Sequence, residues 1–453
     1  MHIGKLCFGA DDFQYGVELC LHKAGYTAIK ADRYNAKSFD VLLVTMFWFR
    51  DIYFFERFRR EAGLIENREK GPVVVIGGVQ ATVTPELCAE VADYVFIGDG
   101  DDHLKGILDE IAAGEKPTCK YLYWKGKDKI PEPAECEPSA FAMQKGNLGN
   151  TTRIEVARGC KFKCKFCVLS GLKSYREVPA ADIIALLEDL AAKKRKIFSL
   201  FAPERHFHSG FKEINDAVYR LKLTDVGADT RLENLNKVVT HKRKRNATFG
   251  LEGISFKLRK SIGKSFTNDY ILEQMGEFTM NSDTVVSMTA YFIADLPGEC
   301  DEDWLELTDL FERIEAADWS RHINLSPVLN PLSPKPFTPL EHAEVHPFRD
   351  YPTKWLNFCR KNNKRWGFRI LEAPVWHPWI RVLDALIHRG GPQAYEVIKR
   401  MPSKLLSKYP KKVDSVYMAK KFLIEVNKYG ITDEMLFAGK PETVKKPERK
   451  AKT

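Results

Sequence analysis

Three closely spaced cysteines are the residues of this sequence most able to do chemistry. Residues 157–167 read ARGCKFKCKFC, which places Cys160, Cys164 and Cys167 at spacings of four and three residues. The charged lysines between them need contact with solvent or with a charged partner, so these cysteines are not simply packed in an apolar core. Thiolate sulfur is the usual ligand of iron-sulfur clusters, and a cluster held by three cysteines leaves one iron open for another ligand. The spacing therefore predicts an iron-sulfur site.

Zinc is the alternative metal for such a group of cysteines. A zinc site of the finger type needs a fourth cysteine or histidine at short spacing, and the next histidine after Cys167 is His206. The first cysteine follows the strand-like run TRIEV, so we expect the loop at the end of a strand. In barrels of alternating strands and helices that end carries the active site.

Length and composition indicate a soluble enzyme. The chain has 453 residues, of which 44% are hydrophobic and 29% charged, which is ordinary for a globular protein with a large core. The longest apolar run, residues 41–49, is too short to cross a bilayer, and Asp11 and Asp12 interrupt a signal peptide, so we expect a cytoplasmic protein with no membrane partner. Ten cysteines without the spacing of a disulfide scaffold indicate a reducing compartment.

Strand-like and helix-like segments alternate along most of the chain. In residues 1–115 the runs KLCFGA, FDVLLVTMF, PVVVIGG and DYVFIGDG predict a Rossmann-like parallel sheet, whose ligand site lies at the carboxyl ends of its strands. Residues 116–150 contain several prolines and are expected to be a linker. Residues 151–342 contain about six further β-α units, fewer than the eight of a full barrel.

The remaining residues are expected to be helical over 343–438, followed by a basic disordered tail over 439–453. The predicted fold class is therefore α/β, with a Rossmann-like parallel-sheet domain, a partial (β/α)6 barrel and a helical C-terminal extension.

The cysteine spacing, with Phe166 before the last cysteine, resembles the signature of the radical SAM superfamily. The resemblance covers residues 151 to about 340. It implies that Cys160, Cys164 and Cys167 hold a 4Fe-4S cluster, and that the open iron binds S-adenosylmethionine (SAM). In that superfamily one electron cleaves SAM to methionine and a deoxyadenosyl radical, which abstracts hydrogen from the substrate. A reductant such as flavodoxin or ferredoxin is also implied.

The same resemblance implies SAM contacts for individual residues. Phe166 falls where the family packs an aromatic side chain against the adenine of SAM. Glu204 falls in the short motif that holds the methionine amino group of SAM in that family, although the usual glycines of the motif are absent. In GLEGISFKLRKSIGK, Glu252 is implied to hold the ribose hydroxyls, while Ser255 and Arg259 reach the carboxylate. The alternative for Arg259 is a solvated helix residue.

Polar residues also end the third strand-like run, ADTRLE. Asp229 and Arg231 are expected to form a polar wall for SAM or substrate. His206 and His208 follow the second run and are interpreted either as barrel-mouth residues or as surface histidines.

The first domain resembles the cobalamin-binding domain of one radical SAM subgroup but departs from its pattern. IGGVQATVTPE and YVFIGDGDDHL carry the resemblance, and Gly77 and Gly78 are implied to let the backbone approach the cofactor. Where the subgroup has a cobalt-binding histidine, this sequence has DDFQYG, which keeps Asp11 and Gly16 but places Phe13 at the histidine position. Phenylalanine has no lone pair for cobalt. Cobalamin is therefore a candidate cofactor that the sequence does not favour, and the domain is alternatively a lid and a scaffold.

The leading functional prediction is a radical SAM isomerase. The resemblance extends to phage-encoded isomerases that move a glycine adduct on thymine of DNA from nitrogen to the α-carbon, which implies a modified nucleobase in DNA or a nucleotide as substrate and the host cytoplasm as location. The alternatives are another small-molecule substrate, a cobalamin-dependent radical SAM C-methyltransferase, and a non-catalytic iron-sulfur module. The sequence predicts no oligomeric state.

The formal charge of +9 is compatible with a DNA substrate but does not establish one. If DNA binds, phosphate contacts are expected from lysines at the barrel mouth, namely Lys161, Lys163, Lys165 and Lys335. The basic runs 193–196 and 241–245 precede predicted strands and should lie on the opposite face.

Overall fold

A computed structural model provides the structure of the chain. It describes residues 1–8, 14–65, 71–144, 151–227, 229–237, 246–282, 285–348, 357, 361, 378–401 and 412–439, with side chains from residue 417 in the last range. Asp11 and Phe13 lie outside these residues.

The N-terminal domain is a six-stranded sheet with strand order β2-β1-β3-β4-β5-β6. All neighbours pair in parallel except β6, which is antiparallel to β5. The strands are β1 Ile3–Cys7, β2 Ile29–Lys30, β3 Val41–Thr45, β4 Val73–Gly77, β5 Tyr94–Phe96 and β6 Leu122–Tyr123. The predicted parallel sheet of the α/β fold is confirmed.

Helices cover both faces of this sheet because its strands are apolar on both sides. In β3, Val41 and Leu43 pack toward one face, while Leu42 and Val44 pack toward the other. Helices α1 Tyr15–Ala24 and α5 Leu104–Ala112 share the core of the first face. The second face is covered by α2 Asp51–Glu61, α3 Val79–Val83 and α4 Pro85–Ala89.

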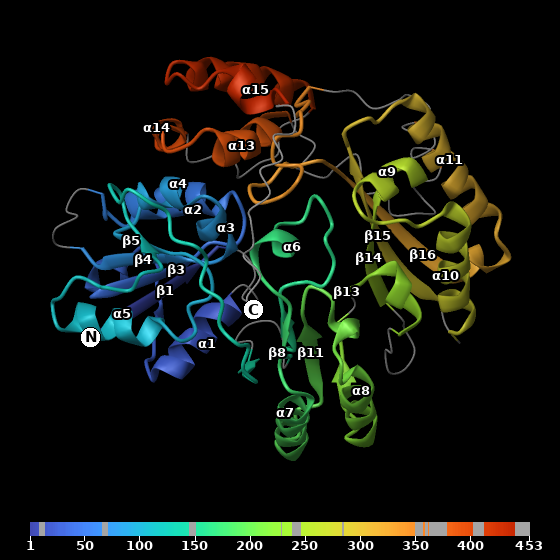
Figure 1. Ribbon diagram of the computed structural model, residues 1–453, viewed down its shortest axis with the longest axis horizontal. Coiled ribbons are helices and arrows are strands. Elements are labelled where there is room, and N and C mark those ends of the chain that lie inside the picture. The colour runs from blue at the N-terminus through green and yellow to red at the C-terminus, as the bar shows by residue number, and fades with distance from the viewer. Residues whose placement is uncertain are drawn as a thin grey trace, which may run out of the picture.

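The C-terminal helices share their apolar core with the N-terminal domain, and Arg381 of α13 also pairs with Asp295 after β15. These helices are α13 Pro378–Arg389, α14 Ala394–Ile398, α15 Lys412–Asn427 and α16 Asp433–Phe437. Leu383 and Leu386 of α13 lie in the same buried core as Leu42 of β3 and Ile76 of β4. Figure 1 shows these helices above α2, α3 and α4. Segments more than 300 residues apart in sequence therefore complete one core.

The radical SAM-like region contains the expected run of parallel strands, divided into two four-stranded sheets. The first has the order β12-β11-β8-β7 and the second β13-β14-β15-β16, with β7 alone antiparallel. The strands are β7 Ala142–Gln144, β8 Thr152–Glu155, β11 Ile197–Phe201, β12 Thr224–Asp225, β13 Asp229–Thr230, β14 Asn246–Gly253, β15 Val286–Ala294 and β16 Ile323–Pro331. The third predicted strand is thus split into β12 and β13.

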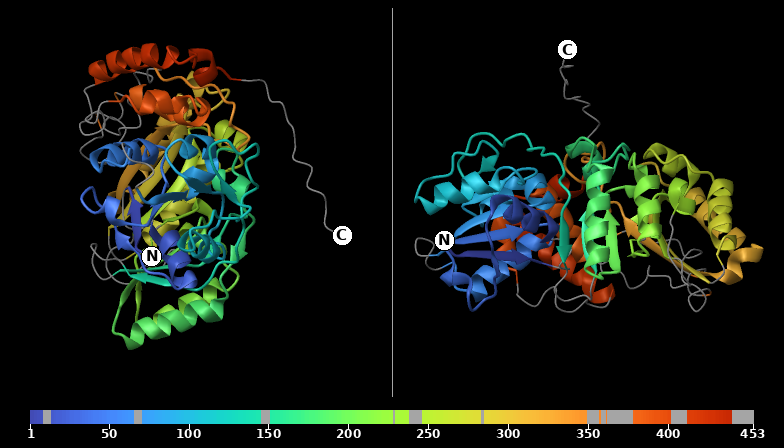
Figure 2. Two further views of the ribbon diagram at one scale, coloured as in Figure 1. Left: turned by 90° about the vertical axis from the view of Figure 1, so that its left-hand side faces the viewer. Right: turned by 90° about the horizontal axis from the view of Figure 1, so that it is seen from below.

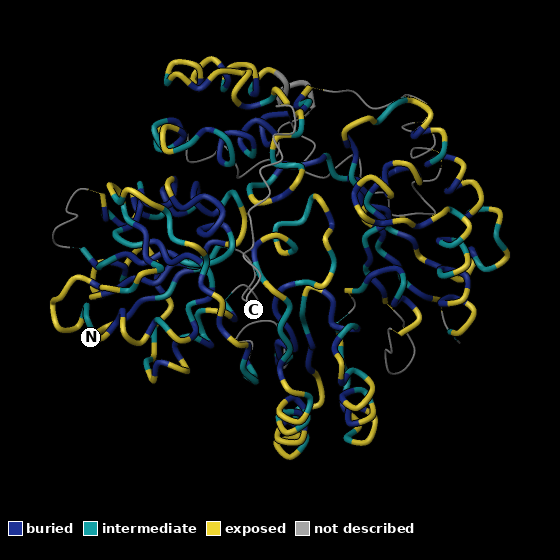
Figure 3. The backbone as a smooth tube through the Cα atoms, in the orientation of Figure 1, coloured by how far each residue is buried: buried dark blue, intermediate teal, exposed yellow. Residues whose placement is uncertain are grey.

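Each of these two four-stranded sheets has its own helices and its own apolar core. The helices are α7 Ala180–Ala192, α8 Phe211–Arg220, α9 Phe256–Ser261, α10 Asn268–Met280 and α11 Asp301–Ala316. Their outer surfaces are exposed while the strands are buried (Figure 3). The N-terminal sheet lies at one end of the molecule and the sheet of β14, β15 and β16 at the other, with β8 and β11 between them (Figures 1 and 2). In the part of the chain that is described, no helix is long and apolar enough to cross a membrane.

Candidate cluster and cofactor site

The three cysteines lie on a loop whose two ends are fastened together. Strands β9 Ala157–Arg158 and β10 Arg176–Glu177 pair antiparallel at the base of the loop. Between them Gly159 adopts φ 68°, and a Cβ there would lie 2.0 Å from the carbonyl oxygen of Ser174. Only glycine fits such a close approach at positive φ. The loop, which includes α6 Val168–Leu172, therefore projects from a closed base at the end of β8.

The thiols of the loop share one environment. Cys164 is buried, and Cys160 and Cys167 are half-buried. Burial raises the pKa of Cys160 and of Cys167, so both thiols favour the protonated form. Metal binding at this loop must therefore release protons.

A cluster and a single metal ion place different demands on the positions of their ligands. Among the described residues, no three His, Cys, Asp or Glu side chains are placed to bind one metal ion together. A cubane cluster takes each thiolate at a separate iron, so its cysteines need not converge on one point. Three half-buried or buried thiols on one loop fit that requirement.

Arg231 lies directly against the cysteine loop. Its Nη1 is 3.5 Å from Cys164 Sγ, and its guanidinium stacks 3.6 Å from the ring centroid of Phe162. Glu233 holds the other side of the guanidinium, with Nη2 to Oε1 at 2.9 Å. The sequence placed Arg231 in a wall for SAM or substrate, and the structure places it beside Cys164, a predicted cluster ligand. A cation here complements a thiolate.

Glu204 is buried and held by several donors. It follows β11 and precedes a short 3-10 turn, Arg205–Phe207. Its Oε1 accepts from the backbone N–H of His206 at 3.0 Å and contacts His206 Nδ1 at 2.9 Å, while Oε2 accepts from the backbone N–H of Arg231 at 2.7 Å. Burial alone would raise the pKa of Glu204, but the bonds and charge of His206 outweigh it and lower the pKa. Glu204 is therefore a fixed carboxylate.

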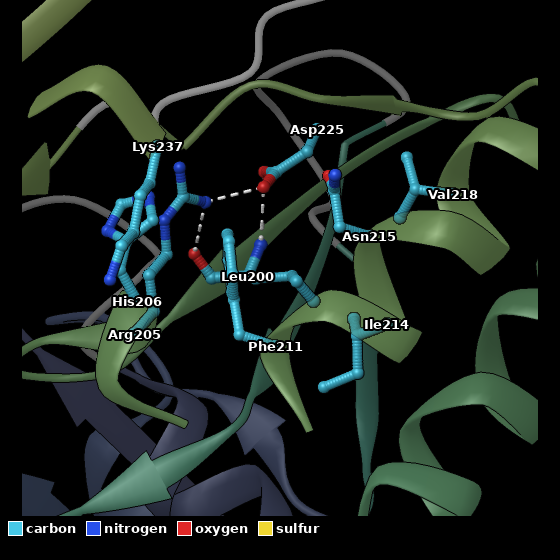
Figure 4. Close-up of a pocket in the computed structure, with 9 residues that line it drawn as sticks. All are labelled: Leu200, Arg205, His206, Phe211, Ile214, Asn215, Val218, Asp225 and Lys237. Carbon is cyan, nitrogen blue, oxygen red and sulfur yellow. Dashed lines mark hydrogen bonds and ion pairs between the residues drawn. The ribbon is translucent and has the colours of Figure 1, made fainter. Parts of the chain in front are cut away.

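His206 is also buried, and a small hollow lies behind it. The hollow is lined by Arg205, His206, Asp225 and Lys237 among others (Figure 4). Arg205 Nη1 contacts Asp225 Oδ2 at 2.5 Å, whereas the buried Arg205 Nε and His206 Nε2 have no hydrogen-bond partner among the described residues. Burial lowers the pKa of His206, and the hydrogen bond and charge of Glu204 offset this only in part. The interpretation of His206 as a surface histidine is wrong, because only 4% of it is exposed.

Glu252, Asp229 and Phe166 lie around the second sheet. Glu252 adopts φ 67° at an irregularity in the pairing of β14 with β15, and Lys264 Nζ approaches its Oε1 at 3.1 Å. Asp229 is exposed and pairs with Thr248 at the start of the β13 ladder. Phe166 is half-buried against the core of this sheet.

Ser255 and Arg259 are engaged inside the protein. The Ser255 hydroxyl caps α9 and donates to Asp303 Oδ1 at 2.6 Å. Arg259 is fully buried and donates to the carbonyl of Phe266 at 2.8 Å and to Asn268 Oδ1 at 2.5 Å. The alternative of a solvated Arg259 is therefore wrong. The Ser255 hydroxyl and the Arg259 guanidinium therefore stabilise the turn after β14.

Buried charges join the cysteine loop to the N-terminal domain. Arg158, at the base of the loop, donates to both oxygens of Asp101 at 2.6 and 2.8 Å and to Glu155 at 2.9 and 3.0 Å. Asp99, at the carboxyl end of β5, pairs with Lys173 and with Arg176. The run GDGDD thus supplies the contacts that fasten the loop, a role that the sequence did not predict.

The carboxyl ends of the two parallel sheets face each other. Tyr15, which follows β1, stacks edge-on at 4.8 Å against Phe201, the last residue of β11. The backbone N–H of Glu155, at the end of β8, lies 3.3 Å from the Tyr15 hydroxyl oxygen. Parallel sheets place ligands at this edge, so both sheets open toward one shared region.

Gly77 ends β4 and Gly78 follows it, and the two glycines have different surroundings. Gly78 adopts φ 103° and approaches the Met46 carbonyl, where a Cβ would lie at 2.4 Å. Among the described residues, a Cβ at Gly77 would meet no heavy atom within 4 Å, and the same holds for Gly16 after β1. The described residues therefore leave room beside these two glycines, where the sequence gave cobalamin as a candidate cofactor that it did not favour.

Comparisons with known proteins agree with this arrangement. Residues 154–311 match the family model of the radical SAM superfamily. An uncharacterised protein of Methanocaldococcus jannaschii is 24% identical over 349 residues, which cover 74% of this chain and 74% of the relative. The bacteriochlorophyllide d C-8(2)-methyltransferase of Chlorobaculum tepidum is 33% identical over 119 residues, 24% of this chain and 26% of the enzyme.

The fold resembles that of a solved enzyme over most of the chain. The radical SAM methyltransferase TsrM of Kitasatospora setae, with tryptophan substrate and a SAM analogue, superposes with a TM-score of 0.57 and 17% identity over 78% of this chain and 80% of TsrM. A second TsrM structure has cobalamin and a 4Fe-4S cluster bound.

Proposed function

We propose that this protein, a member of the radical SAM superfamily, is a radical SAM methyltransferase that uses cobalamin. The observation that carries the proposal is the facing of the two carboxyl edges, with the cysteine loop fastened between them by Asp101 and Arg158. A cofactor on the N-terminal sheet and a cluster on the barrel would then act in one enclosed region.

Cys160, Cys164 and Cys167 would hold the 4Fe-4S cluster. Such a cluster would supply the electron for reductive cleavage of SAM. Arg231 lies against Cys164 and would neutralise part of the thiolate charge. Flavodoxin or ferredoxin stays the predicted reductant.

Glu204 and Glu252 are the strongest candidates for SAM contacts. Glu204 is a fixed, ionised carboxylate, which suits an ammonium group such as the one SAM carries. Glu252 is half-buried at the end of β14, where its second oxygen can accept from ribose hydroxyls. Phe166 would pack against adenine, and Asp229 would line the entrance. SAM contacts by Ser255 and Arg259 stay a prediction, although both groups have internal partners.

Cobalamin is supported by the open space at Gly77 and Gly16 and by its presence in TsrM. The sequence did not favour cobalamin because Phe13 replaces the histidine ligand. Phe13 argues only against ligation of cobalt by that loop. The corrinoid would instead be held by shape and backbone contacts along the carboxyl edge of the sheet.

Substitution of Gly77 tests the cofactor assignment. Because a Cβ at Gly77 meets open space, Gly77→Leu should fold normally but fill the cofactor's room. After anaerobic reconstitution with iron, sulfide and hydroxocobalamin, we expect the parent to bind iron and cobalt and Gly77→Leu to bind iron alone. Gly106→Leu is the matched control, since its Cβ also meets no heavy atom within 4 Å but lies on α5. Equal cobalt in the parent and Gly77→Leu would contradict the assignment.

The isomerase acting on a modified nucleobase in DNA stays a prediction. Iron without cobalt in the reconstituted parent would favour it over the methyltransferase. Two of the four lysines expected to contact phosphate have internal partners: Lys161 contacts the carbonyl of Phe207 at 3.2 Å, and Lys335 pairs with Asp384 at 2.9 Å. The run 241–245 lies outside the described residues.

A further inference from the structure

Phe337 has an unfavourable backbone conformation for its residue type. Its φ is 65°, a region that bulky side chains avoid because Cβ crowds the backbone. Four other non-glycine residues of the described chain share a positive φ, namely Lys194, Lys222, Glu252 and Asp295, and none of them is aromatic. Phe337 is in addition 47% exposed, so its ring returns little packing energy to the folded protein.

The surrounding structure fixes this conformation from two sides. The Phe337 carbonyl oxygen lies so close to α6 that a Cβ on Gly171 would be 2.3 Å from it. The Phe337 N–H donates to Glu341 Oε2 at 3.2 Å, and the N–H of Leu340 reaches the carbonyl of Lys165 in the cysteine loop at 3.4 Å. Strain that neighbours impose in this way concentrates at functional sites.

Lys335 anchors the same turn on its other side. Its Nζ pairs with Asp384 Oδ1 at 2.9 Å and lies 3.4 Å from the ring nitrogens of His388, both on α13. The ammonium also lies 5.3 Å from the ring centroid of Phe49, which follows β3. The turn that carries Phe337 is thus tied to the cysteine loop, to α13 and to the carboxyl edge of the N-terminal sheet.

Further exposed aromatic rings lie at that edge. Phe47 and Trp48 are 39% and 48% exposed and contact each other edge-on at 5.1 Å. Asp51 accepts the backbone N–H groups of both at 2.7 and 2.8 Å, which fixes their loop. Aromatic rings held rigidly at an exposed edge are suited to stacking on a flat ligand.

We propose that Phe337 is a substrate-contacting residue that stacks on a planar ring, so that the substrate class is an aromatic or macrocyclic ring compound. The inference deepens the proposed function and rests on it. The methyltransferase relatives act on ring compounds, bacteriochlorophyllide d and tryptophan, according to their names. A ring stacked on Phe337 would lie beside the cysteine loop, within the region that the two sheets share.

Two substitutions separate the stacking role from a structural one. Phe337→Gly removes the ring and the strained side chain together, because glycine adopts positive φ without penalty. Phe337→Leu keeps an apolar side chain and the strain but removes the flat face. Lys194→Gly is the matched control for the backbone effect, since Lys194 has φ 58° at the end of α7.

The measurements are melting temperature, iron content and binding of named probes to the reconstituted protein. The probes are indole, adenine and chlorin e6 as planar rings and cyclohexanol as a non-planar control, detected by saturation-transfer NMR. We expect the parent to bind at least one planar probe, and both Phe337 variants to bind it about tenfold more weakly or less. Phe337→Gly should keep its iron and a melting temperature no lower than the parent, as should Lys194→Gly.

Three results would overturn the proposal. A parent that binds no planar probe, or that binds cyclohexanol equally well, would exclude the ring class. Undiminished binding by both Phe337 variants would exclude the contact. A large loss of melting temperature in Phe337→Gly would make the ring structural. Absence of iron or of SAM cleavage in the parent would instead count against the proposed function.

Discussion

Two of the interfaces between the N-terminal domain and the rest of the described chain differ in their chemistry. Against the C-terminal helices the contact is mainly apolar, with Trp379 and Leu383 of α13 buried in the same core as β3 and β4, and Tyr395 donates a hydrogen bond to Glu56 beside that core. Against the cysteine loop the contact is ionic, with Asp99 and Asp101 buried beside Arg158.

The two interfaces have different effects: one stabilises the N-terminal domain, and the other positions the cysteine loop. Apolar burial is non-directional and scales with the area removed from water, so the α13 interface stabilises the domain without fixing fine geometry. Buried ion pairs return little net stability but are geometrically demanding, especially the two parallel bonds from Arg158 to Asp101. We infer that the ionic interface holds the cysteine loop in place relative to the sheet.

Breaking the ionic interface should have the largest effect. Arg158→Met leaves Asp101 and Glu155 buried without their cation, which costs about 3–5 kcal/mol of unfolding free energy. We also expect loss of iron, because the base of the cysteine loop is released. Urea denaturation and iron analysis after reconstitution measure both effects.

The neighbouring carboxylate provides the control for this substitution. Asp102 follows Asp101 directly but is 51% exposed and pairs with Lys23 at the surface. Asp102→Asn should leave iron content and stability nearly unchanged. If Arg158→Met and Asp102→Asn behaved alike, the ionic interface would have no positioning role.

Truncation of the apolar interface should reduce stability without releasing iron. Leu383 is fully buried, so Leu383→Ala should cost about 2–4 kcal/mol through lost burial and a cavity. No described residue of the cysteine loop belongs to this core, so iron content should match the parent at a temperature where both are folded. Leu305→Ala, at a position 49% exposed on α11, is the control. Iron loss in Leu383→Ala would contradict the claim that only the ionic interface holds the cysteine loop in place.

Two buried aspartates of the same domain should titrate in opposite senses. Burial raises the pKa of Asp51 to about 6, since the N–H groups of Trp48 and Phe47 offset it only in part. Burial also acts on Asp99, but the charges of Lys173 and Arg158 outweigh it and lower its pKa. Asp51 therefore favours folding below about pH 4 and loses that contribution as pH rises to about 6, whereas Asp99 contributes above its unfolded pKa and loses its contribution in acid.

Asparagine substitutions measure these opposite senses directly. Relative to the parent, Asp51→Asn should gain about 2–3 kcal/mol of unfolding free energy between pH 4 and pH 7, because the parent alone must ionise a buried group. Asp99→Asn should lose stability relative to the parent as pH rises from strong acid to about pH 4. Urea denaturation of the cluster-free proteins across this range provides the values. Parallel slopes for the two variants would contradict the assigned pKa directions.

Local sequence patterns predicted the elements well and their long-range partners poorly. The apolar runs before and after the cysteines predicted the parallel strands, because strand period and β-branched content are local properties. The segment around Trp379 and Leu383 was predicted to be helical, but an apolar helix face does not specify which surface it covers. Its packing on the N-terminal sheet depends on residues more than 300 positions away.

The same limit applies to the site. The spacing of the cysteines is local and could be interpreted without a structure, whereas the contact of Arg231 with Cys164 joins residues 67 positions apart. GDGDD was interpreted as part of a cofactor-binding pattern, and its aspartates proved to bind the base of the cysteine loop. The one available indication was an arginine two residues before the first cysteine, which needs an anion if it is buried.

The central claim is that the three cysteines hold a cluster that cleaves SAM. Anaerobic reconstitution of the parent and of Cys164→Ala, followed by reduction with dithionite in the presence of SAM and quantification of 5'-deoxyadenosine, tests it most directly. We predict about four irons per chain and deoxyadenosine formation for the parent, and neither for Cys164→Ala. Serine is close to cysteine in size but lacks the thiol, so Cys164→Ser is a second variant for this buried position in case Cys164→Ala fails to fold. A variant without the Cys164 thiol that retained its iron and still cleaved SAM would contradict the assignment.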